Sequence, residues 1–311
     1  MRSTAGMTRT VIIAFISNVL VAIAKSIAAA ITGSASLLAE AAHSWADCGN
    51  EIFLLVAERR SVKQRDSAHP LGYGRESYVW SLFAAFGLFT AGAVVSVQHG
   101  IQELITPDPA SNFGIAYVVL AISAVFEGLS FAQSLVQARG NASTIGRDTL
   151  DYALNGSNST LRAVLAEDAA ALAGLAIAFT GILLHQVTGN PVYDALGSLL
   201  IGVLLGAVAL VLINRNRRYL LGTEPRPDVR ARFGEALLAH PDIERLSYLH
   251  LEFVGPGRVY LIAAVDLVGD DSENSVARRL RTIERTLQNT ALIEVAILTL
   301  AVDDEPTLTF G

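Results

Sequence analysis

The feature that most constrains this chain is a series of apolar stretches about as long as a lipid bilayer is thick. Up to six such stretches occur before residue 215, and about 20 predominantly apolar residues are needed to cross the hydrocarbon core as a helix. The sequence therefore predicts an all-α six-helix transmembrane bundle. The expected helices cover residues 11–32, 36–57, 78–102, 113–137, 160–186 and 192–213.

The composition excludes an ordinary soluble globular protein. Hydrophobic residues make up 52% of the 311 residues and charged residues 17%, whereas soluble domains are about 25% charged. The net charge of -6 argues against a nucleic-acid partner. A single cysteine, Cys48, excludes an internal disulfide framework. Because Arg2 and Arg9 lead directly into the first apolar stretch, we expect a retained helix rather than a cleaved signal peptide.

The distribution of basic residues predicts the orientation of the bundle. Lys and Arg are absent from the loop near Gly33 and from residues 103–112 and 185–191, which would all lie on one side of the membrane. Since Lys and Arg concentrate in cytoplasmic loops, we expect both termini in the cytoplasm, and a plasma-membrane location in a prokaryote. The basic residues of the opposite side are Arg2, Arg9, Arg59, Arg60, Lys63, Arg65, Arg75, Arg139, Arg147, Arg215, Arg217 and Arg218.

After the last apolar stretch the sequence is typical of a small water-exposed domain. Helical and strand patterns alternate there, with a turn at Gly255-Pro256-Gly257 and a helix stop at Pro241. The order αββαβ predicts a compact α+β domain. We therefore divide the chain into a transmembrane domain, 1–219, and a cytoplasmic C-terminal domain, 220–311. The expected elements are helices at 229–240 and 276–287 and strands at 246–254, 259–268 and 293–302.

The second expected helix is unusual because it carries Glu40, His43, Asp47, Asn50 and Glu51. A charge at the centre of an inserted helix costs about 2.5 to 3.5 kcal/mol, so such residues face an internal cavity and need partners. His43 and Asp47 are four residues apart and share one face. An imidazole nitrogen and a carboxylate so placed can bind one divalent ion. For the pair taken alone, hydrogen bonding to each other or to a neighbouring helix is the simpler interpretation.

The fifth expected helix favours a metal site over simple hydrogen bonding of His43 and Asp47, because Glu167 and Asp168 lie about two turns inside it. Two acidic neighbourhoods repel each other unless a cation lies between them or the carboxyl groups hold protons. A site that alternates between a metal ion and protons meets both conditions. Adjacent residues point about 100° apart on a helix, so Glu167 and Asp168 cannot both face the second helix squarely.

Three further polar residues lie inside apolar stretches. Lys25 has a structural role as the neutralising partner of Glu40 or Glu167, with proton movement as the alternative. Glu127 is another candidate partner for Lys25. Asp194 is expected to be a solvated carboxylate at the start of the last helix.

The loop Asp66–Glu76 contains Gly72 and Gly74, which allow a sharp turn. One interpretation is a capping turn that precedes the third helix. The alternative is a peripheral metal site built on Asp66 and His69.

Three sequence motifs point to one family. They are Gly33-Ser-Ala-Ser-Leu-Leu-Ala-Glu-Ala-Ala-His-Ser-Trp-Ala-Asp-Cys-Gly-Asn50, His69-Pro-Leu-Gly-Tyr-Gly-Arg-Glu76 and Ala166-Glu-Asp-Ala-Ala-Ala-Leu-Ala-Gly174. Together with six helices and a cytoplasmic αββαβ domain, they resemble the cation diffusion facilitator family, in the branch near the mitochondrial-type zinc carriers. The likeness covers nearly the whole chain.

The resemblance implies a homodimeric transporter rather than an enzyme. Such a protein moves Zn²⁺, or Fe²⁺, Co²⁺ or Mn²⁺, out of the cytoplasm in exchange for protons, without a bound cofactor. The resemblance also implies that His43 and Asp47 are the metal ligands of helix 2 and that Asp168 is the residue of helix 5 that faces them. We expect Glu167 to pair elsewhere, for example with Lys25, while it stays a further candidate ligand. Val164 occupies the position of the usual fourth ligand, so water, Asn50 or Glu167 would complete the site.

The C-terminal domain departs from the family pattern. His240 and His250 are its only histidines, whereas the strands of many relatives carry metal-binding histidines. We therefore expect dimerisation without strong metal sensing. In the loop, Tyr73 stands where relatives often have a second histidine, which weakens the peripheral site.

Two other classes of function remain. A membrane-embedded metallohydrolase would use the same ligands to activate water, with Glu167 as its only candidate base. A non-transporting membrane scaffold would use the polar residues of helix 2 only for assembly.

Overall fold

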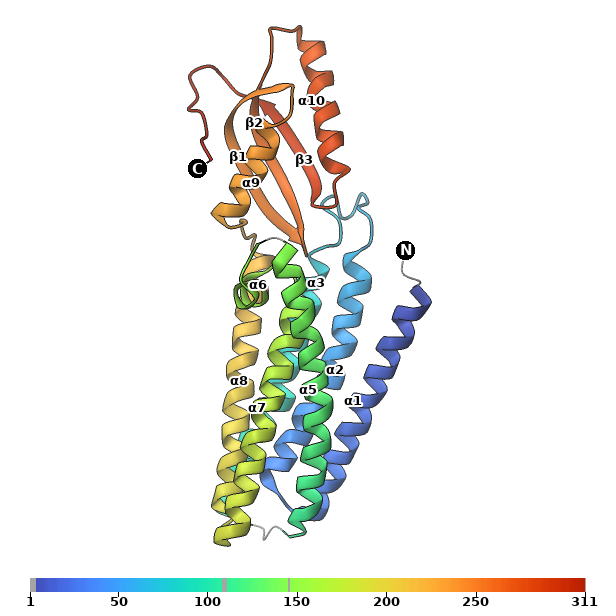
Figure 1. Cartoon of the computed structure of the whole chain (residues 1–311), viewed down its shortest axis with the longest axis vertical. Helices are drawn as coiled ribbons and strands as arrows, with labels where there is room; N and C mark the ends of the chain where they lie inside the picture. The colour runs from blue at the N-terminus through green and yellow to red at the C-terminus, as the bar shows by residue number, and fades with distance from the viewer. Residues whose placement is uncertain (1–3, 108–110, 145, 311) are drawn as a thin grey trace. The chain divides into compact units, whose positions relative to one another are not determined.

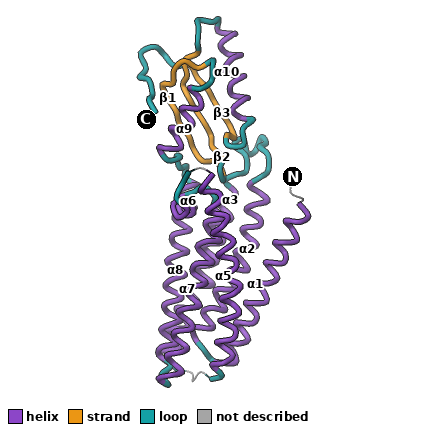
Figure 2. Tube along the Cα trace, viewed as in Figure 1, coloured by secondary structure: helices purple, strands orange, loops and turns teal. Residues whose placement is uncertain are grey.

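The computed structural model describes residues 4–107, 111–144 and 146–310. Arg2 and residues 108–110 of one expected loop lie outside the described residues. The chain forms two compact units. One comprises Met1–Glu58 with Val79–Asn216, and the other comprises Arg59–Tyr78 with Arg217–Gly311. The first unit is helical, and the strands belong to the second (Figure 2).

Long helices make up the first unit (Figure 1). The third apolar segment contains a π-helical stretch, and a short helix precedes the fifth long one; neither was expected from the sequence. The bounds are α1 (Thr4–Thr32), α2 (Ala35–Ser61), α3 (Glu76–Gly87) with the π-helical η1 (Leu88–Val94) and α4 (Val95–Ile105), α5 (Phe113–Thr144), α6 (Thr149–Asn155), α7 (Ser159–Thr188) and α8 (Val192–Leu220).

Five segments within the described ranges are long and apolar enough to cross a membrane: Phe15–Thr32, Glu76–Ile105, Phe113–Ser143, Ser159–Thr188 and Val192–Leu220. Helix α2 has 27 residues but is not among the five, because Glu40, Asp47 and Glu51 interrupt its apolar character. The predicted helical bundle is thus confirmed in its main character, while the count of six spans stays a prediction.

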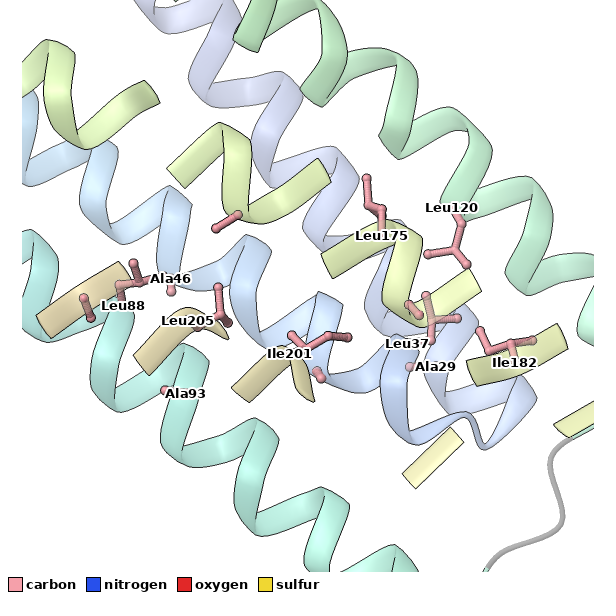
Figure 3. Close-up of a cluster of buried hydrophobic side chains, with 14 of the residues drawn as sticks. Ala29, Leu37, Ala46, Leu88, Ala93, Leu120, Leu175, Ile182, Ile201 and Leu205 are labelled. Atoms are coloured by element: carbon pink, nitrogen blue, oxygen red, sulfur yellow. The ribbon is translucent and has the colours of Figure 1, made fainter. Parts of the chain in front are cut away.

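The core of the bundle draws on every long helix. Leu37 of α2, Leu88 of η1, Leu175 of α7 and Leu205 of α8 are all buried in one cluster (Figure 3). Large apolar side chains also face outward; Val125 of α5, for example, is 62% exposed. An extensive exposed apolar surface is costly in water and is what a helix needs to face hydrocarbon.

The second unit contains the expected small sheet domain. Strand order is β1-β2-β3, with β1 and β2 antiparallel and β2 and β3 parallel. Alternate residues of β2, such as Leu261 and Val265, are buried with Leu237 and Ile283 of the two helices. The elements are α9 (Pro227–Leu238), β1 (Ile243–Gly255), β2 (Arg258–Leu267), α10 (Glu273–Gln288) and β3 (Ile293–Leu300).

The segment Arg59–Tyr78 belongs to this sheet unit, which the sequence did not indicate. A Cβ added to Gly74 would overlap the carbonyl oxygen of Val254 and lie 2.7 Å from the Cα of Gly255. Arg75 forms an ion pair with Glu252 of β1. The segment between α2 and α3 is therefore packed directly on the end of β1, and Gly74 is required there because any side chain would separate the two backbones.

Candidate metal centre

The ionisable residues of α2 follow one face of the helix. Glu40, His43, Asp47 and Glu51 are spaced by three or four residues, the spacing that places side chains above one another. Glu40 and His43 are completely buried, and the side chain of Asp47 is 18% exposed. The helix thus carries a polar stripe from the interior of the bundle toward its own C-terminal half.

A pocket of about 300 Å³ lies beside this stripe. Its lining side chains come from α1, α2, α5 and α7. Among them are five carboxylates, contributed by Asp47, Glu51, Glu127, Glu167 and Asp168. The three predicted carboxylate ligands, Asp47, Glu167 and Asp168, therefore share one pocket, although they come from two helices.

His43 is placed differently from these carboxylates. Its Nε2 lies 3.5 Å from Oδ2 of Asp47, but it is not among the residues that line the pocket. Both of its ring nitrogens are buried and have no hydrogen-bond partner in the part of the chain that the structure describes. His43 thus touches the site through Asp47, and its imidazole keeps both nitrogens available.

The two acidic residues of α7 are held by different neighbours. Asp168 accepts hydrogen bonds from Ser130 at 3.0 Å and from Ser134 at 3.3 Å, both on α5. Glu167 accepts one from the amide of Asn50 at 3.1 Å. The side chains diverge as expected, but in the opposite sense to the expectation: Glu167, and not Asp168, is directed toward α2, whereas Asp168 is directed toward α5.

The acidic residues line one pocket, but their side chains do not converge on one position where an ion could bind. Across the described ranges, no group of three or more His, Cys, Asp and Glu side chains is close enough to hold a metal ion. Val164, at the position where the resemblance implies a ligand, lines the pocket with an apolar side chain. In this arrangement the carboxylates are near one another, and binding of one ion by several of them requires side-chain rotation or helix movement.

Lys25 and Glu40 form a buried ion pair beside the pocket, at 3.0 Å and with both side chains fully buried. Glu40 is thus the partner of Lys25, rather than Glu127 or Glu167. The second carboxylate oxygen of Glu40 has no hydrogen-bond partner among the residues described. It points at Gly174 of α7, where an added Cβ would overlap it, so glycine at 174 is what allows this charge to fit.

The expectation for Asp194 was wrong. Asp194 is only 2% exposed and caps the start of α2. Its carboxylate accepts hydrogen bonds from the backbone N–H groups of Ala35 and Ser36 at 2.7 and 3.2 Å, and from the hydroxyls of Ser34 and Ser36. These N–H groups have no partner within the helix, so Asp194 satisfies them from α8.

The loop cluster around Asp66 and His69 is saturated by its own residues. Oδ1 of Asp66 accepts from the backbone of Ala68 and His69, and Oδ2 accepts from the hydroxyl of Tyr73 at 2.7 Å. The rings of His69 and Tyr73 stack at 3.9 Å. The hydrogen bond from Tyr73, followed by that from the His69 backbone, lowers the pKa of Asp66; the same bond raises the pKa of Tyr73.

Sequence reasoning did not include Glu51, Glu127, Ser130 or Ser134 in the site. A signal was present in α5: Glu127, Ser130 and Ser134 are spaced by three and four residues within an otherwise apolar helix, which is the pattern of a polar stripe facing a cavity. Asn18 of α1 also lines the pocket and donates to Glu51 at 3.2 Å.

The sequence matches the family model described as "Cation efflux transmembrane domain" over residues 11–221. The chain belongs to the cation efflux family. It is 36% identical over 233 residues to metal tolerance protein C4 of Arabidopsis thaliana, covering 75% of this chain and 51% of that protein. It is also 36% identical over 264 residues to the human proton-coupled zinc antiporter SLC30A9, mitochondrial, covering 85% of this chain and 46% of that protein.

A bacterial member of the cation efflux family matches along most of its length. The cation-efflux pump FieF of Escherichia fergusonii is 25% identical over 260 residues, which is 80% of each chain. By contrast, the chain spans about half the length of the plant and mitochondrial relatives. With the apolar segments described above, this membership makes the protein a multi-pass membrane protein, and the predicted likeness to the mitochondrial-type zinc carriers is confirmed.

Proposed function

We propose that the protein exports a divalent cation from the cytoplasm, with Zn²⁺ as the first candidate, in exchange for protons. The observation that carries the proposal is the pocket lined by α1, α2, α5 and α7, to which three of these helices contribute carboxylates. Such groups are costly inside a bilayer unless they serve an ion pathway. The zinc antiporter among the relatives supports both the ion and the exchange.

In the proposed mechanism, Asp47 and Asp168 bind the ion together with His43, and Glu167 is a further ligand. Metal binding needs neutral imidazole and ionised carboxylate, so the ion and protons compete for the same groups. Opening of the pocket toward the cytoplasm loads the ion. Opening toward the other side, followed by proton binding, releases it.

The orientation and assembly follow from the same proposal. Residues 1–219, with α2 as the sixth span, lie in the membrane with both termini in the cytoplasm, and residues 220–311 form the cytoplasmic domain. Two copies of the chain form the transporter. No enzymatic reaction is assigned, since the relatives named above are transport proteins.

The proposal is tested with purified protein in liposomes. Uptake of Zn²⁺, Fe²⁺, Co²⁺ and Mn²⁺ is measured at two lumenal pH values, together with the proton flux. We expect metal uptake driven by an acidic lumen, and its loss in His43→Ala and Asp47→Ala. Uptake that these two substitutions leave unaltered contradicts the site, and the absence of metal-stimulated proton flux in the wild type favours the scaffold.

A further inference from the structure

The five carboxylates of the pocket differ in the protein groups that contact them. Asp47 contacts His43, Glu51 accepts from Asn18, Glu167 from Asn50 and Asp168 from two serines. Glu127 of α5 has neither a hydrogen bond nor an ion pair within the described ranges of the chain. Glu127 and Asp47 are therefore the pocket carboxylates that accept no hydrogen bond from the described residues, and Asp47 has only the 3.5 Å contact with Nε2 of His43.

The position of Glu127 makes this unengaged charge significant. It is the only Asp, Glu, Lys, Arg or His between Phe113 and Gln137, in a helix whose neighbouring side chains Val125 and Phe126 are exposed apolar groups. It is also close enough to Lys25, Asp47 and Asp168 to interact with each electrostatically. The nearest cation, Lys25, is already paired with Glu40 at 3.0 Å, which leaves an excess of negative charge in the pocket.

A second observation, independent of the charges, points to a ligand. Ser44 lines the pocket and is 4% exposed, yet its hydroxyl has no hydrogen-bond partner among the described side chains and backbone. The same holds for Oδ1 of Asp47. Buried polar atoms are normally paired with a hydrogen-bond partner. Two unpaired oxygens on the wall of an acidic pocket are therefore expected where a cation binds to them.

The donor atoms define the chemistry of this site. Side chains of the pocket lining offer carboxylate, hydroxyl and amide oxygens, whereas neither His43 nor Cys48 is among the lining residues. Oxygen ligands suit Mn²⁺ and other hard divalent ions, while Zn²⁺ gains more from imidazole or thiolate. An additional carboxylate from α5 in the same pocket as Asp47 therefore adds more to the binding of a hard ion than to that of Zn²⁺.

We propose that Glu127 is a ligand of the transported ion and a determinant of ion specificity, which extends the range of this transporter toward Mn²⁺. The proposal rests on the proposed function as a metal carrier. Glu127 approaches the ion from α5, in the same pocket as Asp47. The ion thereby connects α2, α5 and α7, rather than α2 and α7 alone.

The test compares Mn²⁺ and Zn²⁺ transport by the full chain in liposomes. Glu127→Gln keeps the size of the side chain and removes its charge. We expect Mn²⁺ uptake at limiting concentration to fall about 10-fold or more, and the ratio of Mn²⁺ to Zn²⁺ uptake to fall as well. Glu127→Asp keeps the charge, so it should retain more Mn²⁺ uptake than the glutamine variant.

Glu103→Gln is the matched control, because Glu103 is a buried carboxylate of α4 outside the pocket lining. It should leave the Mn²⁺ to Zn²⁺ ratio unchanged. An unchanged ratio in Glu127→Gln, in a protein that transports both ions, overturns the proposal. So does an equal loss of Mn²⁺ uptake in the glutamine and aspartate variants.

Direct binding separates this proposal from the proposed function. The electron paramagnetic resonance signal of free Mn²⁺ measures binding to the detergent-solubilised chain without any transport. If the wild type binds Mn²⁺ but moves no metal, the transport function fails, and weaker binding in Glu127→Gln still supports the ligand role. Equal Mn²⁺ binding by wild type and Glu127→Gln refutes the ligand role, whatever the flux.

Discussion

The pocket between α1, α2, α5 and α7 and the loop around Asp66 both combine acidic residues with a nearby histidine, yet they are built in opposite ways. In the loop, each carboxylate oxygen of Asp66 accepts a hydrogen bond from the protein, and Tyr73 occupies the face of His69. In the pocket wall, the ring nitrogens of His43 and one oxygen of Asp47 are buried without such partners in the described chain. The two regions thus have similar residue types but differ in whether their polar atoms already have partners in the protein.

The largest difference between the two regions is expected when one acidic residue of each is replaced by alanine. Asp47→Ala should reduce metal uptake by more than about 100-fold, because even groups that only support metal ligands are worth about 10- to 100-fold. Asp66→Ala should leave uptake within about twofold of the wild type. Both are measured as initial rates of Zn²⁺ uptake in liposomes. Similar losses in the two variants would show that the saturated loop also binds the transported ion.

A second prediction concerns Gly174, which lies against the carboxylate of Glu40 in its buried ion pair with Lys25. Gly174→Ala places a methyl group against Glu40 and should separate it from Lys25, which costs about 3 kcal/mol of unfolding free energy because a buried charge loses its partner. Gly140→Ala in α5 is the control, since nothing lies within 4 Å of a Cβ there; it should be neutral or slightly stabilising.

Thermal unfolding in detergent compares these two glycine variants. Equal melting temperatures would mean that the bundle accommodates the methyl group without disturbing the ion pair.

Substitutions at Asp194 test whether the start of α2 is held independently of the proposed metal ligands. Asp194→Ala leaves the N–H groups of Ala35 and Ser36 buried without an acceptor, and should lower the unfolding free energy by about 2 kcal/mol. Asp194→Asn keeps an acceptor oxygen and should recover part of that loss. Hydrogen exchange at the first turn of α2 reports the effect locally, and unchanged protection of those amides would contradict the capping role.

The smallest effect is expected in the loop. Tyr73→Phe removes the hydroxyl that lowers the pKa of Asp66, so this pKa should rise toward its ordinary value. A carboxyl group whose pKa is lower in the folded state stabilises the fold above its unfolded pKa, and this contribution is lost as the pH falls through the folded pKa. The variant should therefore lose less stability on acidification. Carboxyl ¹³C chemical shifts of Asp66 follow the titration, and an unchanged pKa would rule out the hydroxyl as its cause.

Sequence reasoning located the pocket because a charge in an apolar helix must find a partner or a cavity. It expected Asp47 and Asp168 to share a site with His43, and Glu167 to pair elsewhere. Asp47, Asp168 and Glu167 all line the pocket, whereas His43 does not. That reasoning did not identify Glu127 as part of the wall, since the rotation of α5 relative to α2 depends on packing of the whole bundle. It also expected Asp194 in solvent, because its partners lie about 160 residues earlier in the chain.

The same limit applies to the C-terminal unit. Strand and helix patterns predicted a small sheet domain, because alternation and turn residues are local properties. The packing of Gly74 on Gly255 joins residues that are far apart in sequence, and the glycine spacing of the loop indicated only a turn. Local periodicity thus predicted the elements, while contacts between distant segments required the structure.

Helix α2 is bound to another helix at its start. Its first turn donates two backbone N–H groups to the carboxylate of Asp194 on α8. Sliding of α2 along its own axis relative to α8 would break these hydrogen bonds. A single carboxylate of α8 therefore determines the height at which α2 holds Asp47, about three turns further along, relative to α8.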